Sequence, residues 1–419
     1  MNRGKYGLLC GVAALALSTM AGTGSATADD SAIKIKWKGA PEIESADGKW
    51  KVKMRGRLFA DYAHVSGDKT PGSTHQYVRA TEFRAARLGI EGLMFGNTKY
   101  KFEVDFEGNE ATIKDAYIQM KKPFGSPVDF KVGQFKSPNS LEEQTSSRFI
   151  TFMERAAFTD AFGFARLTGI GVTTHGTNWT FNAGAFGENI NTKKAQEGHT
   201  LAARVTFAPI ATKDKAIHFG ASIRYRKFSN SDKTVQYRQR PQVHQETRYI
   251  STPKLSADGD LLYGLEAAGV WGPFSVQGEY ARTKTDLLVG KDPSFHGYYI
   301  SASWFLTGEH RTYKGSKGAF GRVKVRHPVQ EGGYGAWQVA VRYDTIDLND
   351  SGVIGGMQDA IVTGVNWYLN DHTRVMFNYI NARVDDVPTT ILGESTIVAG
   401  TPGNNNNINA VQLRAQLDF

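Results

Sequence analysis

Arginine residues recur at every second position in parts of this chain. Arg55 and Arg57 are separated by one glycine, and Arg224 and Arg226 are separated by one tyrosine. In a β-strand, side chains two residues apart point to the same face, so each pair would present two guanidinium groups together. A guanidinium group stays charged and offers a fixed fork of donors that can hold an oxyanion through two hydrogen bonds. The spacing therefore indicates the binding and transfer of anions.

The residue types needed for catalysis are present without the spacing that catalysis requires. Serine, histidine and aspartate all occur, but the sequence contains no GxSxG, HExxH or P-loop motif. The ten histidines are scattered singly, unlike the clusters that bind a metal ion. We therefore expect no enzyme, no cofactor and no metal site. A hydrolase that uses serine and histidine residues of a barrel wall stays open as an alternative.

The elements that must position the arginines are best seen at the C-terminus. Residues 410–419 alternate between apolar and polar side chains and end on an aromatic residue, Phe419. A period of two over about ten residues is the length and pattern of a tilted strand in a transmembrane β-barrel. A terminal aromatic residue is also typical of the strand that the outer-membrane assembly machinery recognises. An edge strand of a soluble sandwich is the alternative.

The same pattern predicts an all-β fold, a 16-stranded antiparallel transmembrane barrel. An even number returns the C-terminus to the periplasm, as bacterial barrels require. Short turns then fall on one side and long loops, including 65–78, 137–163, 229–259 and 385–407, on the other. The connector 308–334 is long where a short periplasmic turn is expected. The predicted strands are 51–64, 79–95, 98–107, 111–121, 128–136, 164–174, 178–187, 199–208, 216–227, 260–271, 274–285, 296–307, 335–348, 357–369, 373–384 and 408–419.

The N-terminus predicts export from the cytoplasm. Two basic residues precede a short apolar run, and the sequence Ala26-Thr27-Ala28 follows, which is the pattern of a secretory signal peptide. We expect a signal peptide at 1–28, a periplasmic segment at 29–50 and the barrel at 51–419. No stretch of the sequence has the roughly eighteen apolar residues of a transmembrane helix. The only cysteine, Cys10, lies in the signal peptide, so the mature chain has no thiol chemistry.

Strand parity assigns one set of arginines to the lumen. A ring of basic side chains in a narrow pore raises the local concentration of anions and repels cations. The alternative for each arginine is an ion pair with a carboxylate of the wall. The arginines with lumen parity are Arg55, Arg57, Arg87, Arg204, Arg224, Arg226 and Arg342.

Several segments resemble the phosphate-selective porins O and P, in the order of that family from about residue 50 to the end. The resemblance implies a trimer of sixteen-stranded barrels, each with its third loop folded into the pore and arginines along the lumen. The matching segments are GRLFADY (56–62), EFRAARLGIEG (82–92), VGQFKSPNSLEEQTSSRFITFMER (132–155), AARVTFAP (202–209), GYYISASWFLTGE (297–309), GAWQVAVRY (335–343) and GVNWYLN (364–370).

The resemblance also implies which residues line or support the constriction. By motif, these are Arg57, Arg84, Ser146, Ser147 and Arg155. Arg84 has the parity of a lipid-facing residue, so it must bend inward to reach the pore.

Three positions depart from the family pattern. Ala85 stands where a second, paired arginine is expected, and Arg87 follows two positions later. Lys114 stands where an acidic residue is expected beside the constriction, and Glu143 where a lysine is expected. The pore stays basic, but the geometry of its binding site is altered.

The sequence therefore predicts a bacterial outer-membrane porin with an anion-selective channel for phosphate or a related oxyanion. A general small-anion porin without phosphate specificity and a non-conducting structural or adhesive barrel stay open as alternatives. Expected partners are inorganic phosphate or other small anions, outer-membrane lipids, the outer-membrane assembly machinery and further copies of the chain in a homotrimer. No nucleic acid partner is expected.

Overall fold

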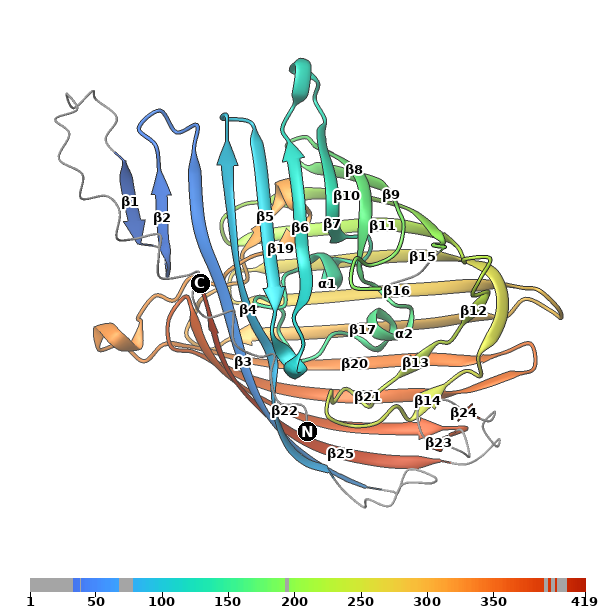
Figure 1. The fold of residues 1–419 in the computed structure, drawn as a ribbon. Coiled ribbons are helices and arrows are strands. Elements are labelled where there is room, and N and C mark those ends of the chain that lie inside the picture. The colour runs from blue at the N-terminus through green and yellow to red at the C-terminus, as the bar shows by residue number, and fades with distance from the viewer. Residues whose placement is uncertain are drawn as a thin grey trace, which may run out of the picture.

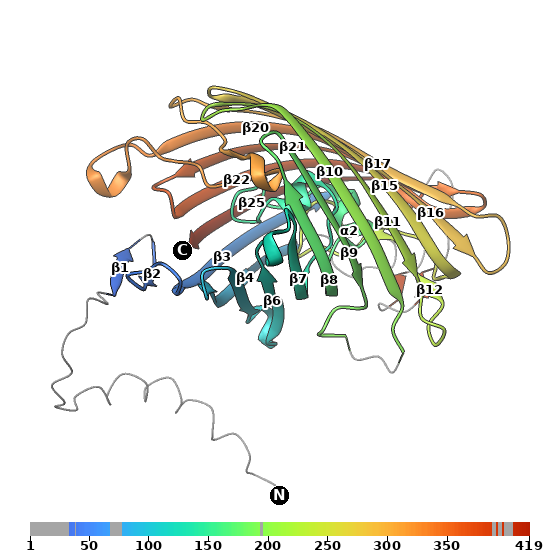
Figure 2. The same ribbon diagram turned by 90° about the horizontal axis from the view of Figure 1, so that it is seen from above.

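A closed barrel dominates the structure, which is a computed structural model (Figures 1 and 2). It describes residues 33–37, 39–67, 78–192, 196–387, 391–392, 396–397 and 405–419. The predicted signal peptide lies outside these residues. The last strand, β25 (Asn406–Asp418), pairs with the first barrel strand, β3 (Lys51–Gly67), and this pairing closes the antiparallel sheet.

The described residues contain the sixteen barrel strands that the sequence predicts. Most predicted boundaries lie within two residues of the observed ones. Between β3 and β25 the barrel strands are β4 (Val78–Met94), β5 (Thr98–Asp105), β6 (Thr112–Met120), β7 (Asp129–Lys136), β8 (Arg166–His175), β9 (Trp179–Phe186), β10 (His199–Ala211), β11 (Lys215–Lys227), β15 (Leu255–Trp271), β16 (Phe274–Leu287), β17 (Ser294–Phe305), β20 (Ala336–Asp350), β21 (Val353–Tyr368) and β22 (Thr373–Asp385).

The alternating pattern of each strand places apolar side chains outside and polar side chains inside. In β25, Leu413 and Leu417 are exposed on the outer face, whereas Arg414 and Gln416 are buried in the interior. This is the arrangement of a barrel whose outer face meets lipid. None of the helices in the described ranges is long and apolar enough to cross a membrane.

A short hairpin precedes the barrel. Strands β1 (Lys34–Trp37) and β2 (Pro41–Glu44) pair with each other, and β2 pairs with the first residues of β3. At the same end of the barrel, the ring of Phe419 packs against Gly56, where an added Cβ would lie 2.3 Å from the ring. Only glycine leaves room for this contact.

Three long connectors fold into the barrel and form its interior core. The first, residues 137–165, is called the inward loop here and contains α1 (Leu141–Gln144) and α2 (Ala157–Ala161). The second, residues 228–254, covers the inward loop and contains β12 (Thr234–Val235), β13 (Arg238–Gln239) and β14 (Ile250–Ser251). Short elements elsewhere are η1 (Glu107–Asn109), η2 (Pro123–Gly125), β23 (Ile391–Leu392) and β24 (Thr396–Ile397).

The third connector, residues 306–335, is called the periplasmic connector here. It contains β18 (Tyr313–Lys314), η3 (Gly315–Lys317), β19 (Ala319–Phe320) and η4 (Val329–Glu331). Its length has a physical reason that the sequence did not reveal. Tyr313, Ala319 and Phe320 pack in one apolar cluster with Leu141 of the inward loop and with small residues of the wall, so the segment enters the barrel instead of forming a turn.

Candidate functional site

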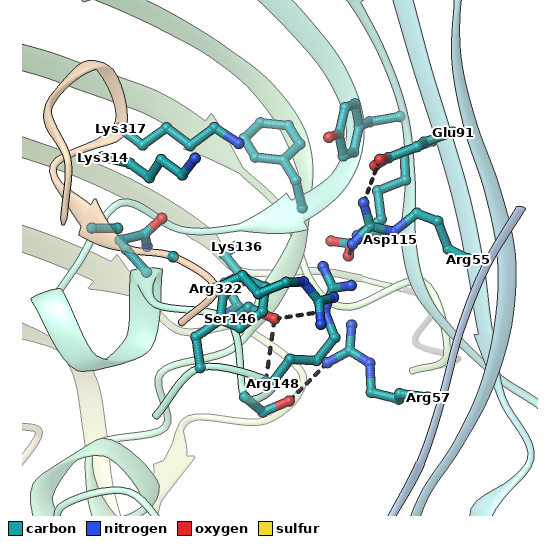
Figure 3. A pocket seen from close by; sticks show the side chains of 18 of the residues that line it. Arg55, Arg57, Glu91, Asp115, Lys136, Ser146, Arg148, Lys314, Lys317 and Arg322 are labelled. Carbon is teal, nitrogen blue, oxygen red and sulfur yellow. Dashed lines mark hydrogen bonds and ion pairs between the residues drawn. The ribbon is translucent and has the colours of Figure 1, made fainter. Parts of the chain in front are cut away.

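A cavity of about 1020 Å³ lies between the inward loop, the periplasmic connector and the wall formed by β3–β9 (Figure 3). Among the described residues, its lining contains eighteen lysines and arginines but only five aspartates and glutamates. The lining therefore has thirteen more basic than acidic side chains. Carboxylates behind the lining, such as Glu103 and Glu143, pair with some of these basic groups, and the remaining excess attracts anions and repels cations. The side chains labelled in Figure 3 come from the wall, the inward loop and the periplasmic connector and point toward one another.

Seven of the twelve predicted site residues line this cavity. They come from β3, from β4 and from the inward loop, and they include every residue implied by motif. The seven are Arg55, Arg57, Arg84, Arg87, Ser146, Ser147 and Arg155.

Arg57 connects the wall to the inward loop. Its Nη1 donates to the Oγ of Ser147 at 2.7 Å, and its Nη2 donates to both carboxylate oxygens of Glu103 on β5 at 3.1 and 3.2 Å. Arg57 is buried, so these partners fix the direction of its fork. A wall arginine and a loop serine therefore meet on one side of the cavity.

A β-bulge explains why Arg84 faces the lumen. In the pairing of β3 with β4, Phe59 lies opposite Ala85 while the next residue, Ala60, lies opposite Phe83. Arg84 is the extra residue, and a bulge of this kind turns a side chain away from the face that regular parity gives it. Arg84 then forms two hydrogen bonds with Glu154 of the inward loop, at 2.9 and 3.1 Å.

A second bulge lies at Lys114, where Glu103 pairs with Asp115 but Val104 pairs with Ile113. The Nζ of Lys114 lies 3.5 Å from Asp105, and Arg87 donates to the same carboxylate at 2.6 Å. Lys114 is absent from the lining of the cavity, so its expected place in the pore stays a prediction. Its charge is drawn to Asp105 beneath the lumen surface.

Glu143 lies between two basic residues of the cavity lining and neutralises part of their charge. Its carboxylate lies 3.1 Å from Lys136 and 3.1 Å from Arg155. Burial would raise the pKa of Glu143, but the charges of Arg155 and Lys136 outweigh burial and lower it. Arg155 also donates to the carbonyl oxygens of Glu142 and Thr145, at 3.1 and 3.0 Å. Arg155 therefore lines the cavity with most of its donors already used.

Four predicted lumen arginines lie on the interior face but not on the cavity. Arg342 donates to the carbonyl oxygen of Glu154, and Arg224 donates to that of Phe162, so both clamp the inward loop. Arg204 binds Glu266 and the carbonyl oxygen of Gly318, and so clamps the periplasmic connector.

Arg226 forms an ion pair with Asp260. None of the four lines the cavity, because buried acceptors take up their forks; their place on the interior face agrees with strand parity, and their role as pore-lining residues stays a prediction. The residues concerned are Arg204, Arg224, Arg226 and Arg342.

Sequence reasoning missed the lysines of the cavity. Six of them form no ion pair with any carboxylate in the part of the chain that the structure describes. Lys99 has lumen parity in a predicted strand, so alternation alone could have identified it. Lys314 and Lys317 lie on the periplasmic connector, whose entry into the barrel leaves no periodic signal. The six are Lys53, Lys99, Lys121, Lys131, Lys314 and Lys317.

Arg148 and Arg322, which were also missed, both contact the Phe149 ring, with their guanidinium carbons 4.9 and 5.2 Å from its centre. Both also form an ion pair with Asp418. The inward loop and the periplasmic connector are thereby joined to the last strand. Within the described ranges, no group of three or more histidine, aspartate or glutamate side chains could hold a metal ion.

Comparisons with known proteins agree with this geometry. A family model described as phosphate-selective porin O and P matches residues 52–419. An uncharacterized protein of Caulobacter vibrioides is 35% identical over 359 residues, which are 83% of this chain and 71% of that protein. Porin O of Pseudomonas aeruginosa is 29% identical over 428 residues, covering 92% of this chain and 95% of the relative.

Two solved structures share the fold. The anion-selective porin from Comamonas acidovorans has a TM-score of 0.55 and 16% identity, covering 88% of this chain and 100% of that one. The trimer form of OmpT, an outer membrane protein of Vibrio cholerae, has a TM-score of 0.54 and 12% identity, covering 88% and 99%. At these identities the likeness concerns the barrel fold.

Proposed function

The chain belongs to the phosphate-selective porin O and P family and is a porin of the bacterial outer membrane, and from that premise we propose that its pore conducts anions in preference to cations. The observation that carries the proposal is the lining of the cavity, with eighteen basic and five acidic side chains among the described residues. Fixed charges of one sign in a narrow, water-filled passage enrich the opposite ion. Family and fold are those of a channel rather than of an enzyme.

The solute we propose is phosphate or a related oxyanion, held weakly. Arg57 and Arg87 at the constriction already donate to Glu103 and Asp105, so an entering anion must compete with these carboxylates. Ala85 removes a second fork next to Arg84. Sites of this kind favour release of the anion over tight binding, and transport requires such release.

A general small-anion porin is the second candidate, and the six unpaired lysines favour it. An ammonium group is a point charge without the fixed fork of a guanidinium group, so it attracts anions of many shapes. Of the twelve predicted site residues, this proposal includes only the seven that line the cavity.

Planar-bilayer recording tests both proposals. In a salt gradient, the reversal potential should show anion preference, and added phosphate should block chloride current only at millimolar concentration. Cation preference would overturn the anion proposal. Block at micromolar phosphate, which corresponds to about 8 kcal/mol of binding, would show a tight site and contradict weak holding.

We also propose that the protein assembles as a homotrimer through the wall formed by β5–β9. These strands have eight to ten residues, whereas the other barrel strands have twelve to seventeen. Strands β5–β9 carry no exposed tyrosine at their extracellular ends, whereas exposed tyrosines lie on many of the other strands. These exposed tyrosines are Tyr62, Tyr225, Tyr263, Tyr280, Tyr298, Tyr343 and Tyr379. The missing tyrosines distinguish this part of the wall from the other strands, and contact with a protein neighbour instead of the lipid interface would account for the difference. Native mass spectrometry in mild detergent should give trimers, and monomers would contradict the proposal.

Processing and insertion complete the proposal. Cleavage after Ala28 would leave residues 29–50, including β1 and β2, in the periplasm, and Phe419 would present β25 to the assembly machinery before the barrel enters outer-membrane lipid. The intact mass of the mature protein should correspond to a chain that starts at Asp29. A mass that retains residues 1–28 would contradict cleavage.

A further inference from the structure

Lys131 projects from β7 into the cavity between two aromatic rings. Its Nζ lies 4.7 Å from the centre of the Tyr117 ring and 4.9 Å from the centre of the Phe135 ring. The two rings meet edge to face, with centres 6.2 Å apart. All three side chains line the cavity. The ammonium group therefore has two aromatic contacts at the surface of the proposed anion path.

Two carboxylates of the same part of the wall, Asp129 and Asp115, are occupied by other groups. Asp129 lies two residues before Lys131 on the same strand, but it accepts hydrogen bonds from the Nε2 of Gln119 at 2.8 Å and from the backbone N–H of Lys122 at 3.1 Å. Asp115 is bound by Lys101 and Arg166. Lys131 consequently has no ion pair with any residue that the structure describes.

An aromatic ring and a carboxylate affect a cation differently. Both stabilise it, but the ring does so through its quadrupole and carries no net charge. A lysine paired with aspartate loses its long-range field, whereas a lysine held by rings keeps it. The contacts at Lys131 thus hold an ammonium group at the cavity surface without a carboxylate that neutralises it.

We propose that Tyr117 and Phe135 are positioning residues that hold Lys131 in the lumen as an unneutralised cation, and that Lys131 thereby determines selectivity for anions. The inference rests on the proposed anion pore and identifies one place where its selectivity arises. Lys131 lies toward the periplasmic end of β7, and Lys136 lies at the other end, beside the inward loop. An anion that leaves the constriction meets Lys131 on its way to the periplasm.

Three single variants and one double variant test the proposal in planar bilayers, with the anion-to-cation permeability ratio as the readout. Lys131→Met removes the charge and should lower the ratio by up to about five-fold, because one unit charge about 4 Å from an ion in water contributes about 1 kcal/mol. Tyr117→Leu keeps an apolar side chain but removes one of the two ring contacts, so the ammonium group of Lys131 is held less firmly at the cavity surface and the ratio should fall part of the way. Tyr117→Phe keeps the ring and should leave the ratio unchanged.

The double variant separates the aromatic contact from a general structural effect. If Tyr117 acts through Lys131, Tyr117→Leu should have no further effect on the ratio in the Lys131→Met background. Tyr117 is the better site for this cycle because Phe135 also packs against Phe186. Each variant must show the heat-modifiable mobility of a folded barrel, and Tyr117→Met replaces Tyr117→Leu if the latter does not fold.

Several outcomes would overturn the inference. An unchanged ratio in Lys131→Met would remove Lys131 as a selectivity residue. A fall in Tyr117→Phe equal to that in Tyr117→Leu, no fall in Tyr117→Leu, or additive effects in the double variant would each remove the role of the ring. Cation preference in the unsubstituted protein would instead overturn the proposed function, so the two failures are distinguishable.

Discussion

The Nε of Arg84 lies 2.9 Å from the Oε1 of Glu154, and this ion pair joins the wall of the barrel to the inward loop. Arg84 reaches its partner only because a bulge in β4 turns it inward. Glu154 also lies 3.4 Å from Arg414 of the last strand. The position of the inward loop on this side of the cavity is therefore set by a carboxylate held between two arginines from different strands.

Glu154→Gln should loosen the inward loop. The amide keeps the size of the side chain but loses the charge, and a hydrogen bond to a charged group contributes about 1.5–3 kcal/mol. We expect a lower temperature for the heat-modifiable transition and larger fluctuations of the open-channel current. Glu331→Gln, at an exposed position of the periplasmic connector, is the matched control and should change neither. Equal behaviour of the two variants would contradict the role of Glu154.

The same pair should respond to acid only at very low pH. Burial would raise the pKa of Glu154, but the charges of Arg84 and then Arg414 outweigh burial and lower the pKa to about 2. A carboxyl group whose pKa is lower in the folded than in the unfolded state contributes stability above its unfolded value, near 4.3, and loses it as the pH falls toward 2. Channel currents should therefore be steady from pH 7 to about 4 and become noisy below about 3. A midpoint between pH 4 and 5 would show that Glu154 is not held by the two arginines.

The clamp arginines should affect stability without affecting selectivity. Arg374 is buried and donates to the carbonyl oxygen of Ile150 at 2.9 Å and to Gln416 at 2.7 Å, so its fork holds the inward loop although Arg374 does not line the cavity. Arg374→Met should leave these acceptors without a donor, which costs about 1–3 kcal/mol for each buried group. We expect increased current noise at an unchanged reversal potential. A shifted reversal potential would place Arg374 in the ion path.

The sequence predicted the barrel well because membrane strands repeat one simple rule. Alternation and an even count are enough to find sixteen strands, and parity puts Arg57 and Arg87 inside. Parity cannot distinguish an interior side chain that meets water from one that meets a folded-in loop, so Arg204, Arg224, Arg226 and Arg342 were assigned to the pore. That distinction depends on which half of the barrel the inward loop covers, which is a tertiary property.

Bulges and inward segments limited the rest of the prediction. Arg84 and Lys114 both lie at bulges, where the period of two fails; the motif nevertheless identified Arg84. The periplasmic connector is held by contacts such as that between Arg204 and the carbonyl oxygen of Gly318, 114 residues apart, which no local pattern reveals. Its lysines were missed for the same reason.

Removal of Phe419 should impair assembly of the barrel. The backbone N–H of Phe419 donates to the carbonyl oxygen of Gly56 at 3.0 Å, the N–H of Gly56 donates back at 3.2 Å, and the ring covers Gly56. Without Phe419 the seam between β25 and β3 loses its last pair of hydrogen bonds. Heat-modifiable electrophoresis should show a reduced folded yield. A normal yield would contradict both the contact and its role as an assembly signal.

Selectivity should depend on the arginines of the cavity and not on lumen parity as such. Arg155 lines the cavity, whereas Arg226 also points into the barrel but is held by Asp260 away from the cavity. One unit charge within about 4 Å of an ion in water contributes about 1 kcal/mol, which is about a five-fold change in local anion population. Arg155→Gln should therefore lower the anion-to-cation permeability ratio several-fold.

Arg87→Glu should lower the same ratio further, because it reverses a charge on the cavity wall and leaves Lys114 as the one ion-pair partner of Asp105 among the described residues. Arg226→Gln removes the same charge from the chain as Arg155→Gln, so a general effect of net charge would lower the ratio equally in both. We expect the ratio of Arg226→Gln to stay at the value of the unsubstituted protein. If the two glutamine variants instead behave alike in reversal-potential measurements, the ion path does not follow the cavity beside β3–β9, and the selectivity has to arise from the field of the whole barrel.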